Sequence, residues 1–190
     1  DGRLSEAISL FEQILTDSIR ILGNDHPDTL IVRNNLAYTY QHAGCLNKAI
    51  SLYEQILTDS IRILGDDHPN TLASRNNLAY ANVLTDKLDD AIALYEQNLA
   101  NRMRVMGVDH PQTLSTRNSL SHAYQVAGKL DQAIPLSERT FSDSLRILGD
   151  RHPLTIFFRL TLSHAYRLAG RNEEADNLLE GFDDSEELQV

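Results

Sequence analysis

The stretch LGDDHPNTL at residues 64–72 decides the fold, because the chain contains related copies of it four times. The other copies have their Gly at positions 23, 107 and 149, so that successive copies are 42 residues apart. A Gly just after an apolar-periodic run predicts a helix that ends in the left-handed conformation, where the missing Cβ costs nothing. The Pro suits the first position of the next helix, because the N–H that it lacks has no partner there. Each copy therefore predicts a helix end, a short turn and a helix start, and the fixed period predicts a helical array.

The composition excludes several classes of protein. No apolar run in the 190 residues approaches the roughly 20 residues that span a bilayer, so we expect no membrane contact. No charged and then apolar leader is present, which gives no reason to expect secretion. The single cysteine, Cys45, rules out an internal disulfide and a thiolate metal cluster, and it fits a reducing compartment. We therefore expect a cytoplasmic protein.

The net charge of −10 is concentrated at one end of the chain. From Arg171 onward the sequence has one basic and eight acidic residues, whereas the first 170 residues have 16 basic and 19 acidic residues. A nucleic-acid binder needs a basic stripe that neutralises phosphates, and the sequence has none. We expect no nucleic acid partner.

Each repeat contains two predicted amphipathic helices. In the first full unit, apolar residues recur at spacings of three and four from Pro27 to about Ala43, and again from Asn47 to Leu64. This pattern predicts an all-α fold, a right-handed alpha-alpha superhelix of about nine helices. The expected parts are a leading helix at residues 4–22, units at 24–65, 66–107, 108–149 and 150–181, and a flexible acidic tail at 182–190.

A second turn separates the two helices of each unit. It contains Gly44, Gly128 or Gly170, and Asp86 takes this position in one unit because Asp tolerates the left-handed region better than most residues. Good N-cap residues follow this turn, and we expect them to cap the second helices: Ser5, Asn47, Asp89 and Asp131. Because the first residues of the chain align with this turn, we expect the chain to be a fragment of a longer array or of a larger protein.

The spacing within the units resembles the tetratricopeptide repeat. Leu36-Ala37-x-x-Tyr40 in the first helix and Ala49-x-x-x-Tyr53 in the second follow the signature of that family. The 42-residue period, the His-Pro turn and the Asn-Asn-Leu-Ala of the first helix resemble the kinesin light chain repeats. They look equally similar to bacterial arrays attached to nucleotide-binding signalling domains. The resemblance departs at four positions where kinesin light chains usually have an apolar residue, so it does not carry over their cargo preference: Arg33, Arg75, Arg117 and Arg159.

The resemblance implies a non-enzymatic scaffold that binds an extended peptide or partner segment in a concave groove lined by the first helices. It places the groove residues on the face opposite the Leu36 and Tyr40 seam. An Asn side chain there can donate to and accept from one peptide unit, and Tyr and His offer flat apolar area with a polar tip. The candidate groove residues are Asn34, Tyr38, Gln41, Asn76, Tyr80, Val83, Asn118, His122, Gln125, His164 and Arg167. The same face carries Ile31, Ala73, Ser115, Phe157 and Leu160, with Asn35 and Asn77 at its edge. The alternative is that all of these are ordinary surface residues.

Three repeated sets of residues allow a chemical and a structural interpretation. Equivalent histidines of the His-Pro turns lie two helices apart, on the order of 20 Å, so no single ion reaches two of them, and we expect each to cap or pack its helix start. The glutamates Glu12, Glu54, Glu96 and Glu138 project singly, whereas acid–base catalysis needs converging groups. We therefore expect no catalytic site, no metal and no cofactor.

The arginine set predicts a structural ladder. Counting outward from the turns places Arg33 level with Asp17 on the preceding helix and with Asp59 on its own partner helix. We expect Arg–Asp pairs that fix the helix register, weakened where Asn101 replaces Asp. Direct contact between these arginines and a ligand is the alternative.

Assembly is the second function that the sequence supports. The first helix and the last helical pair lack the polar outer faces that solenoids need at their ends, so end-on stacking into a homo-oligomer, or a role as the regulatory arm of a larger signalling protein, is the alternative to peptide capture. A further hypothesis concerns Phe182, whose acidic neighbours resemble the aromatic ligands of kinesin light chains and make the tail a candidate internal ligand.

Overall fold

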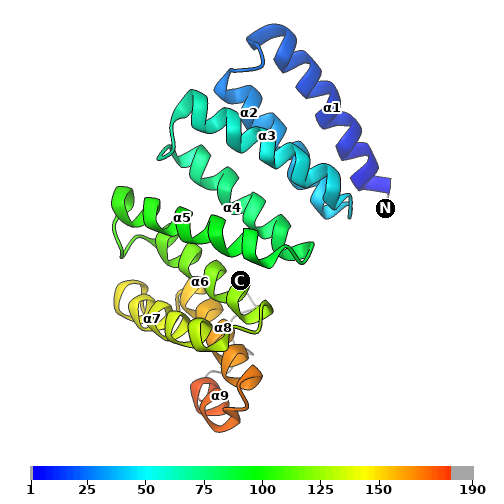
Figure 1. The fold of residues 1–190 in the computed structure, drawn as a ribbon. Helices are drawn as coiled ribbons and strands as arrows, with labels where there is room; N and C mark the ends of the chain where they lie inside the picture. Colours follow the sequence, from blue (N-terminus) through cyan, green and yellow to red (C-terminus); the bar gives the residue numbers. More distant parts are fainter. Residues whose placement is uncertain (1, 181–190) are drawn as a thin grey trace. The chain divides into compact units, whose positions relative to one another are not determined.

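The computed structural model describes residues 2–180, which form nine α-helices and no strand (Figure 1). The helices are α1 (Gly2–Leu22), α2 (Pro27–His42), α3 (Leu46–Leu64), α4 (Pro69–Leu84), α5 (Leu88–Met106), α6 (Pro111–Val126), α7 (Leu130–Leu148), α8 (Pro153–Leu168) and α9 (Asn172–Leu179). The predicted all-α class is confirmed, with helix limits close to the expected ones. The acidic tail predicted at 182–190, with its hypothesis of an internal ligand, lies outside the described residues.

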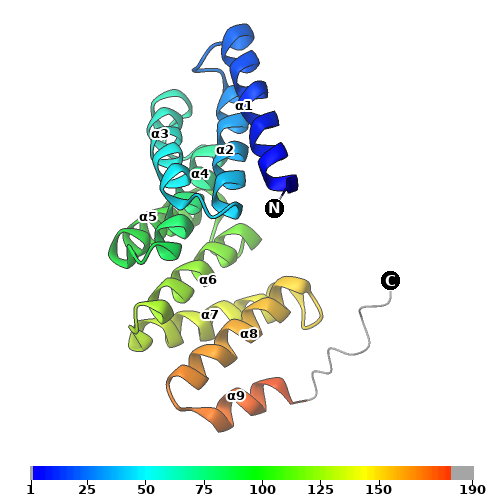
Figure 2. The ribbon, with the colours of Figure 1, turned by 90° about the vertical axis from the view of Figure 1, so that its right-hand side faces the viewer.

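The chain divides into two compact units, one ending at Val105 and the other beginning at Met106. In the first unit α1 packs on α2, α2 on α3 and α3 on α4; in the second, α6 packs on α7, α7 on α8 and α8 on α9 (Figures 1 and 2). The first helices of neighbouring repeats also touch, α2 with α4 and α6 with α8. Each unit therefore presents a layer of first helices and a layer of second helices.

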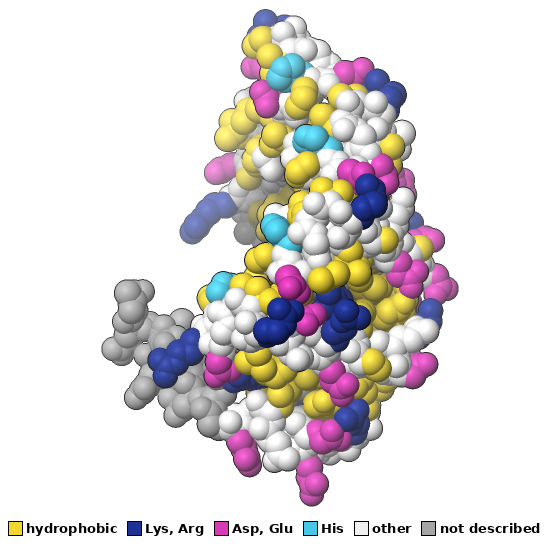
Figure 3. Space-filling model, turned by 90° about the vertical axis from the view of Figure 1, so that its left-hand side faces the viewer, with side chains coloured by type: hydrophobic (Ala, Val, Ile, Leu, Met, Phe, Trp, Pro, Cys, Tyr) yellow, Lys and Arg dark blue, Asp and Glu magenta, His cyan; other side chains and the backbone are white. Residues whose placement is uncertain are grey.

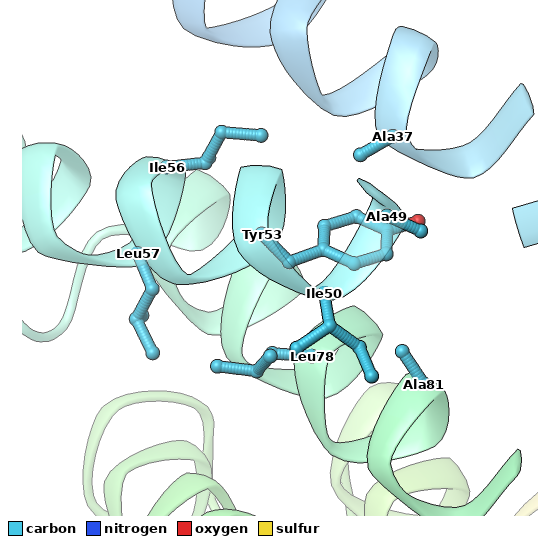
Figure 4. Close-up of a cluster of buried hydrophobic side chains, with 8 residues drawn as sticks. All are labelled: Ala37, Ala49, Ile50, Tyr53, Ile56, Leu57, Leu78 and Ala81. Atoms are coloured by element: carbon cyan, nitrogen blue, oxygen red, sulfur yellow. The ribbon is translucent and has the colours of Figure 1, made fainter. Parts of the chain in front are cut away.

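The core of the first unit forms around α3 (Figure 4). Tyr53 of α3 is fully buried, Ala37 covers one side of α3 from α2, and Leu78 and Ala81 cover the other side from α4. The small side chains of Ala37, Ala49 and Ala81 let the three helices approach closely. The second unit has its own cluster, made of Ile134, Leu162, Ala165, Tyr166 and Ala175.

The turn between successive repeats ends one helix and caps the next. Gly65 closes α3 with φ 91° and ψ 163°, so the predicted left-handed helical conformation is wrong; the backbone lies in an extended region that is open almost only to glycine. Pro69 is the first residue of α4, as predicted. The Asn70 N–H donates to Nδ1 of His68 at 3.2 Å, and the other turn histidines, His26, His110 and His152, accept in the same way at 3.1–3.2 Å. The capping interpretation of the histidines is confirmed.

The turn between the two helices of one repeat differs from the prediction at the start of the second helix. Gly44 has φ 75° and Asp86 has φ 60°, so Asp does occupy the left-handed position. Cys45 is the N-cap of α3 without a side-chain cap, and its C=O already accepts from the Ala49 N–H at 3.1 Å. The helix therefore resumes directly after the glycine. The residues expected as N-caps lie inside α1, α3, α5 and α7, and that prediction is wrong: Ser5, Asn47, Asp89 and Asp131.

Candidate functional site

Buried arginines fix the first helix of a repeat to its second helix. Nη1 of Arg33 donates to Oδ2 of Asp59 at 2.6 Å, and Nη1 of Arg117 donates to Oδ2 of Asp143 at 2.6 Å. The arginine side chains are 7% and 3% exposed. The predicted Arg–Asp pairing between the two helices of a repeat is confirmed for Arg33 and Arg117, whereas Arg159 contacts Asp150 of the preceding turn. The guanidinium groups of Arg33 and Arg117 are therefore engaged within the protein, and Arg33 also lines a hollow between α1, α2 and α3.

The ladder changes partner where the second helix has no suitable Asp. Asn101 stands at the position of Asp59 and Asp143, and there Arg75 bonds instead to Asp66 of the preceding turn. Nδ2 of Asn101 donates to the other oxygen of Asp66 at 2.6 Å, so one carboxylate serves both side chains. The partner is exchanged, and Nε and Nη1 of Arg75 are buried without a hydrogen-bond partner among the described residues, in agreement with the expected weakening.

Asp17 does not reach Arg33, and this part of the ladder prediction is wrong. It accepts from Nη2 of Arg20, three residues along α1, at 2.9 Å. Both side chains are largely exposed.

A second set of contacts on the outside joins the helices within a repeat and between successive repeats. Arg62 near the end of α3 makes a two-point contact with Asp25 of the preceding turn, at 3.0 and 2.7 Å. The Tyr40 hydroxyl donates to Oε1 of Glu12 at 2.6 Å, and this hydrogen bond is the main cause that raises the pKa of Tyr40 to about 12. In the second unit Arg146 contacts Asp109 in the same two-point manner, and the Tyr166 hydroxyl donates to Glu138. These acidic residues hold helices together.

In the first unit the candidate face lies on α2 and α4. Tyr38 and Tyr80 are 53% and 43% exposed, and each lies one turn beyond a half-buried asparagine, Asn34 or Asn76. The amide of Asn77 donates to Oδ1 of Asn34 at 3.1 Å, so a residue that the sequence places at the edge of the face ties α4 to α2. The structure thus presents two aromatic rings on an amide-bearing surface.

Two further candidates of the first unit are buried. Gln41 and Val83 are each 9% exposed. Oε1 of Gln41 is a buried acceptor that finds no hydrogen-bond partner among the described residues. These two residues lie beneath the face, and the Tyr38 ring contacts the His42 ring with centroids 4.2 Å apart and the ring planes tilted by 59°.

In the second unit two histidines share the candidate face on α6 and α8. Nδ1 of His164 donates to Oε1 of Gln125 at 3.0 Å, while Nε2 of the buried Gln125 donates to the Thr161 carbonyl at 3.4 Å. His122 is exposed, although part of its side chain is buried. This partial burial and the neighbouring His164 lower the pKa of His122. Gln125 therefore positions His164, and the two imidazoles lie near each other.

The remaining predicted residues of the second unit differ in exposure. Asn118 is 3% exposed, and its Oδ1 has no partner among the described residues. Arg167 is exposed and pairs with Asp176 at 3.3 Å. Asn118 thus contributes to the floor of the face, and Arg167 to its rim.

Three apolar residues of the same face are more exposed than most of the chosen candidates. Phe157 is 55% exposed, Ile31 45% and Leu160 43%. The sequence places them on this face, but a preference for polar contacts leaves them out of the candidate set. Large exposed apolar side chains are the signal that points to them.

Two hollows among the described residues of the first unit lie away from this face. They have volumes of about 560 Å³ and 490 Å³, lie between α1, α2 and α3, and share Leu15, Leu52 and Gln55 in their walls. None of the predicted groove residues lines them. The candidate face is therefore an open surface, which suits a peptide better than a small molecule.

Within residues 2–180, no three His, Cys, Asp or Glu side chains are placed to hold a metal ion. None of the described helices combines the length and hydropathy that a membrane span needs. On the face drawn in Figure 3, basic and acidic side chains are interspersed.

The tetratricopeptide repeat family model matches the chain in four overlapping segments, residues 1–58, 31–102, 76–142 and 112–180. No curated protein matches the chain.

Solved structures match over nearly the whole chain. A variant form of a Podosopora anserina protein, described as a kinesin light chain with nearly identical TPR-like repeats, has a TM-score of 0.84 at 30% identity, and the match covers 94% of this chain and 84% of that one. BtubC (BKLC) from P. vanneervenii has a TM-score of 0.81 at 24% identity, with 94% and 71% covered. MamA AMB-1 has a TM-score of 0.59 at 22% identity, with 94% and 86% covered. The last two matches concern the fold alone.

Proposed function

This chain belongs to the tetratricopeptide repeat family, and on that premise we propose that it binds an extended segment of a partner protein on the exposed face of its first helices. Tetratricopeptide repeats are generally protein–protein interaction scaffolds, and such scaffolds are typically not enzymes. The partner, on this proposal, is a protein or peptide.

The exposed tyrosines of the first unit carry the proposal. Tyr38 and Tyr80 occupy the same position in successive repeats, and a rigid aromatic side chain supplies contact area at a low entropic cost. Asn34 and Asn76 beside them bear amide groups that match the backbone of an extended peptide. Aromatic residues of this kind dominate the binding energy of many interfaces.

The second unit supports the same role with a different composition. Phe157 and Leu160 provide an apolar patch, while His122 and His164 add polar ring atoms. We assign contact with the partner to these exposed residues and to Arg167, and assign the support of the face to the buried Asn118 and Gln125, as we do for Gln41 and Val83.

A peptide selection tests the proposal. Peptides are selected from a random library on the intact chain, and their dissociation constants are measured with a Tyr38→Ala/Tyr80→Ala variant. We expect affinity to fall at least tenfold, because two buried aromatic contacts are lost. The matched control is Ile61→Ala, which removes an equally exposed apolar side chain from the second-helix layer and leaves affinity unchanged. Equal affinity for the intact chain and the tyrosine variant would refute the proposal.

End-on assembly is the second candidate function. The observation that favours it is α1, in which no residue is buried and six large apolar residues are exposed. Size-exclusion chromatography with light scattering separates the two functions: a mass that rises with concentration supports assembly, and a monomer at high concentration counts against it.

A further inference from the structure

Two histidines occupy the same repeat position on neighbouring helices of the second unit. His122 of α6 and His164 of α8 are 42 residues apart in the sequence, and both side chains are exposed. Because α6 and α8 pack directly against each other, the separation on the order of 20 Å that is expected for the turn histidines does not apply to this pair. The same position holds Tyr38 and Tyr80 in the first unit, so the histidine pair distinguishes the second unit.

A buried glutamine determines which nitrogen of the His164 ring carries the proton. Nε2 of Gln125 donates to the Thr161 carbonyl and to Oγ of Ser121, both at 3.4 Å. Oγ of Ser121 donates its own proton to the Ala133 carbonyl at 2.9 Å, so it accepts from Gln125. The other amide atom, Oε1, therefore faces His164, and Nδ1 of His164 carries the proton in the 3.0 Å hydrogen bond between them.

This tautomer leaves Nε2 of His164 with a free lone pair. Histidines that bind metal ions are held in the same way, because they donate their other ring N–H to a carbonyl or carboxylate oxygen. Gln41, the counterpart of Gln125 in the first unit, makes no such bond: Oε1 of Gln41 has no partner among the described residues, and Tyr80 stands at the position of His164. The glutamine thus orients a possible metal ligand in the second unit.

His122 completes the pair in its neutral form. It lies one helical turn before Gln125 on the same side of α6, which places it beside the ring that Gln125 holds. Partial burial and the neighbouring His164 lower the pKa of His122, so its imidazole is neutral at neutral pH and also offers a lone pair. Arg167, one turn after His164 on α8, pairs with Asp176 of α9 at 3.3 Å, which compensates its charge.

We propose that His122 and His164 bind a divalent late transition metal ion such as Zn²⁺, for which neutral imidazole is a common ligand. Packed helices lie about 8–10 Å apart and a Zn–N bond is about 2.0–2.1 Å long, so side chains from two facing helices can share one ion. The proposal departs from the sequence-based expectation of no metal, because the pair depends on the direct packing of α6 on α8.

The chain supplies only part of the coordination shell. Within residues 2–180, no third His, Cys, Asp or Glu joins this pair. Water fills the remaining positions of the bound ion, and a donor atom of the partner segment can replace it, a role that rests on the proposed function. With two protein ligands, the site binds its ion more weakly than a four-ligand structural site.

Zinc titration of the intact chain tests the proposal without any peptide, so its failure would leave the groove proposal standing. Isothermal titration calorimetry with zinc chloride should show one ion per chain, with a Kd on the order of 10 μM for two imidazole ligands. His122→Ala and His164→Ala should each weaken binding about tenfold or more, because a single imidazole remains. The matched control His42→Ala removes an exposed histidine from α2, where its ring contacts Tyr38, and should leave the Kd unchanged.

A second measurement tests the tautomer of His164 in the absence of metal. Long-range proton–nitrogen NMR spectra of the imidazole rings should show the proton on Nδ1 of His164, and circular dichroism should show that the alanine variants keep their helices. Each of four results would overturn the proposal. These are no zinc binding at about 1 mM, a Kd that the two histidine variants change no more than His42→Ala does, a proton on Nε2 of His164, or one zinc ion per two chains, which would place the ligands in different copies.

Discussion

Asp17 and Asp59 occupy the same position in successive repeats, but their environments differ. Asp59 receives a buried guanidinium from Arg33, whereas Asp17 has only its exposed neighbour Arg20. A buried charge must be paired, because its separation from water is costly, whereas an exposed pair contributes little. The pairing with aspartate therefore explains how the first helix accommodates an Arg among its buried residues.

Substitution of Asp59 and of Asp17 by alanine measures how much each carboxylate contributes to the stability of the fold. We expect Asp59→Ala to lower the free energy of unfolding by about 2 kcal/mol, since it leaves the Arg33 guanidinium buried and unpaired. The matched change Asp17→Ala should cost less than about 0.5 kcal/mol. Urea unfolding of both variants gives the two values, and equal losses would contradict the assignment of the ladder.

The ladder also predicts how stability depends on pH. Partial burial opposes ionisation of Asp59, but hydrogen bonds from Arg33 and Arg62 outweigh it and lower the pKa of Asp59; Asp143 is affected in the same way through Arg117 and Arg146. Below a pH of about 4 the unfolded chain takes up protons that the folded carboxylates resist, so the free energy of unfolding falls as the pH falls. Denaturation curves from pH 6 to 3 should show a smaller decrease for Asp59→Asn/Asp143→Asn. If the free energy of unfolding of the variant falls with pH as steeply as that of the original chain, this origin of the pH dependence is wrong.

At the level of elements, the helices are predictable because the residues that end and start them act locally. Glycine, His and Pro end one helix and start the next through contacts within a few residues, so the sequence alone locates α2, α4, α6 and α8. The capping of α3 by Asn47 was mispredicted, because the C=O of Cys45 begins the helix two residues earlier. The sequence also does not predict the partner of Arg75, because the partner depends on which carboxylate the side chain reaches in the folded chain.

The two turn glycines should respond differently to substitution. Gly65, with φ 91° and ψ 163°, lies where a Cβ is strained, so we expect Gly65→Ala to lower the free energy of unfolding by about 1–3 kcal/mol. Gly44 occupies the left-handed region that Asp86 also adopts, and Gly44→Asn should cost less than about 1 kcal/mol. Thermal unfolding of both variants compares them; a larger loss for Gly44→Asn would contradict the assigned turn conformations.

At the scale of the whole chain, the period predicted the fold, but it did not predict which face residues a partner reaches. Helical spacing shows that Gln41, Asn118 and Gln125 share a face with Tyr38. It does not show that neighbouring first helices bury them, because burial depends on how closely α2 approaches α4 and α6 approaches α8. Exposure thus narrows the candidate set to the tyrosines, the histidines, Arg167, the half-buried Asn34 and Asn76, and the apolar residues beside them.

The prediction of one solenoid domain over residues 1–181 concerns the cooperativity of the chain. In a repeat array, each repeat is stabilised mainly by its neighbours, so a short array is expected to unfold as a unit. Scanning calorimetry should then show a single transition whose calorimetric and van't Hoff enthalpies agree. Two separate transitions would contradict a single domain.

Photo-crosslinking tests the central claim most directly, because it identifies the surface that a bound partner touches. A library-selected peptide that carries a photoreactive residue is crosslinked to the intact chain, and the modified residues are mapped by mass spectrometry. Binding on the exposed face of the first helices predicts crosslinks to Tyr38 and Tyr80 or to His122, Phe157 and His164. Crosslinks confined to the second helices α3, α5 and α7 would contradict the account.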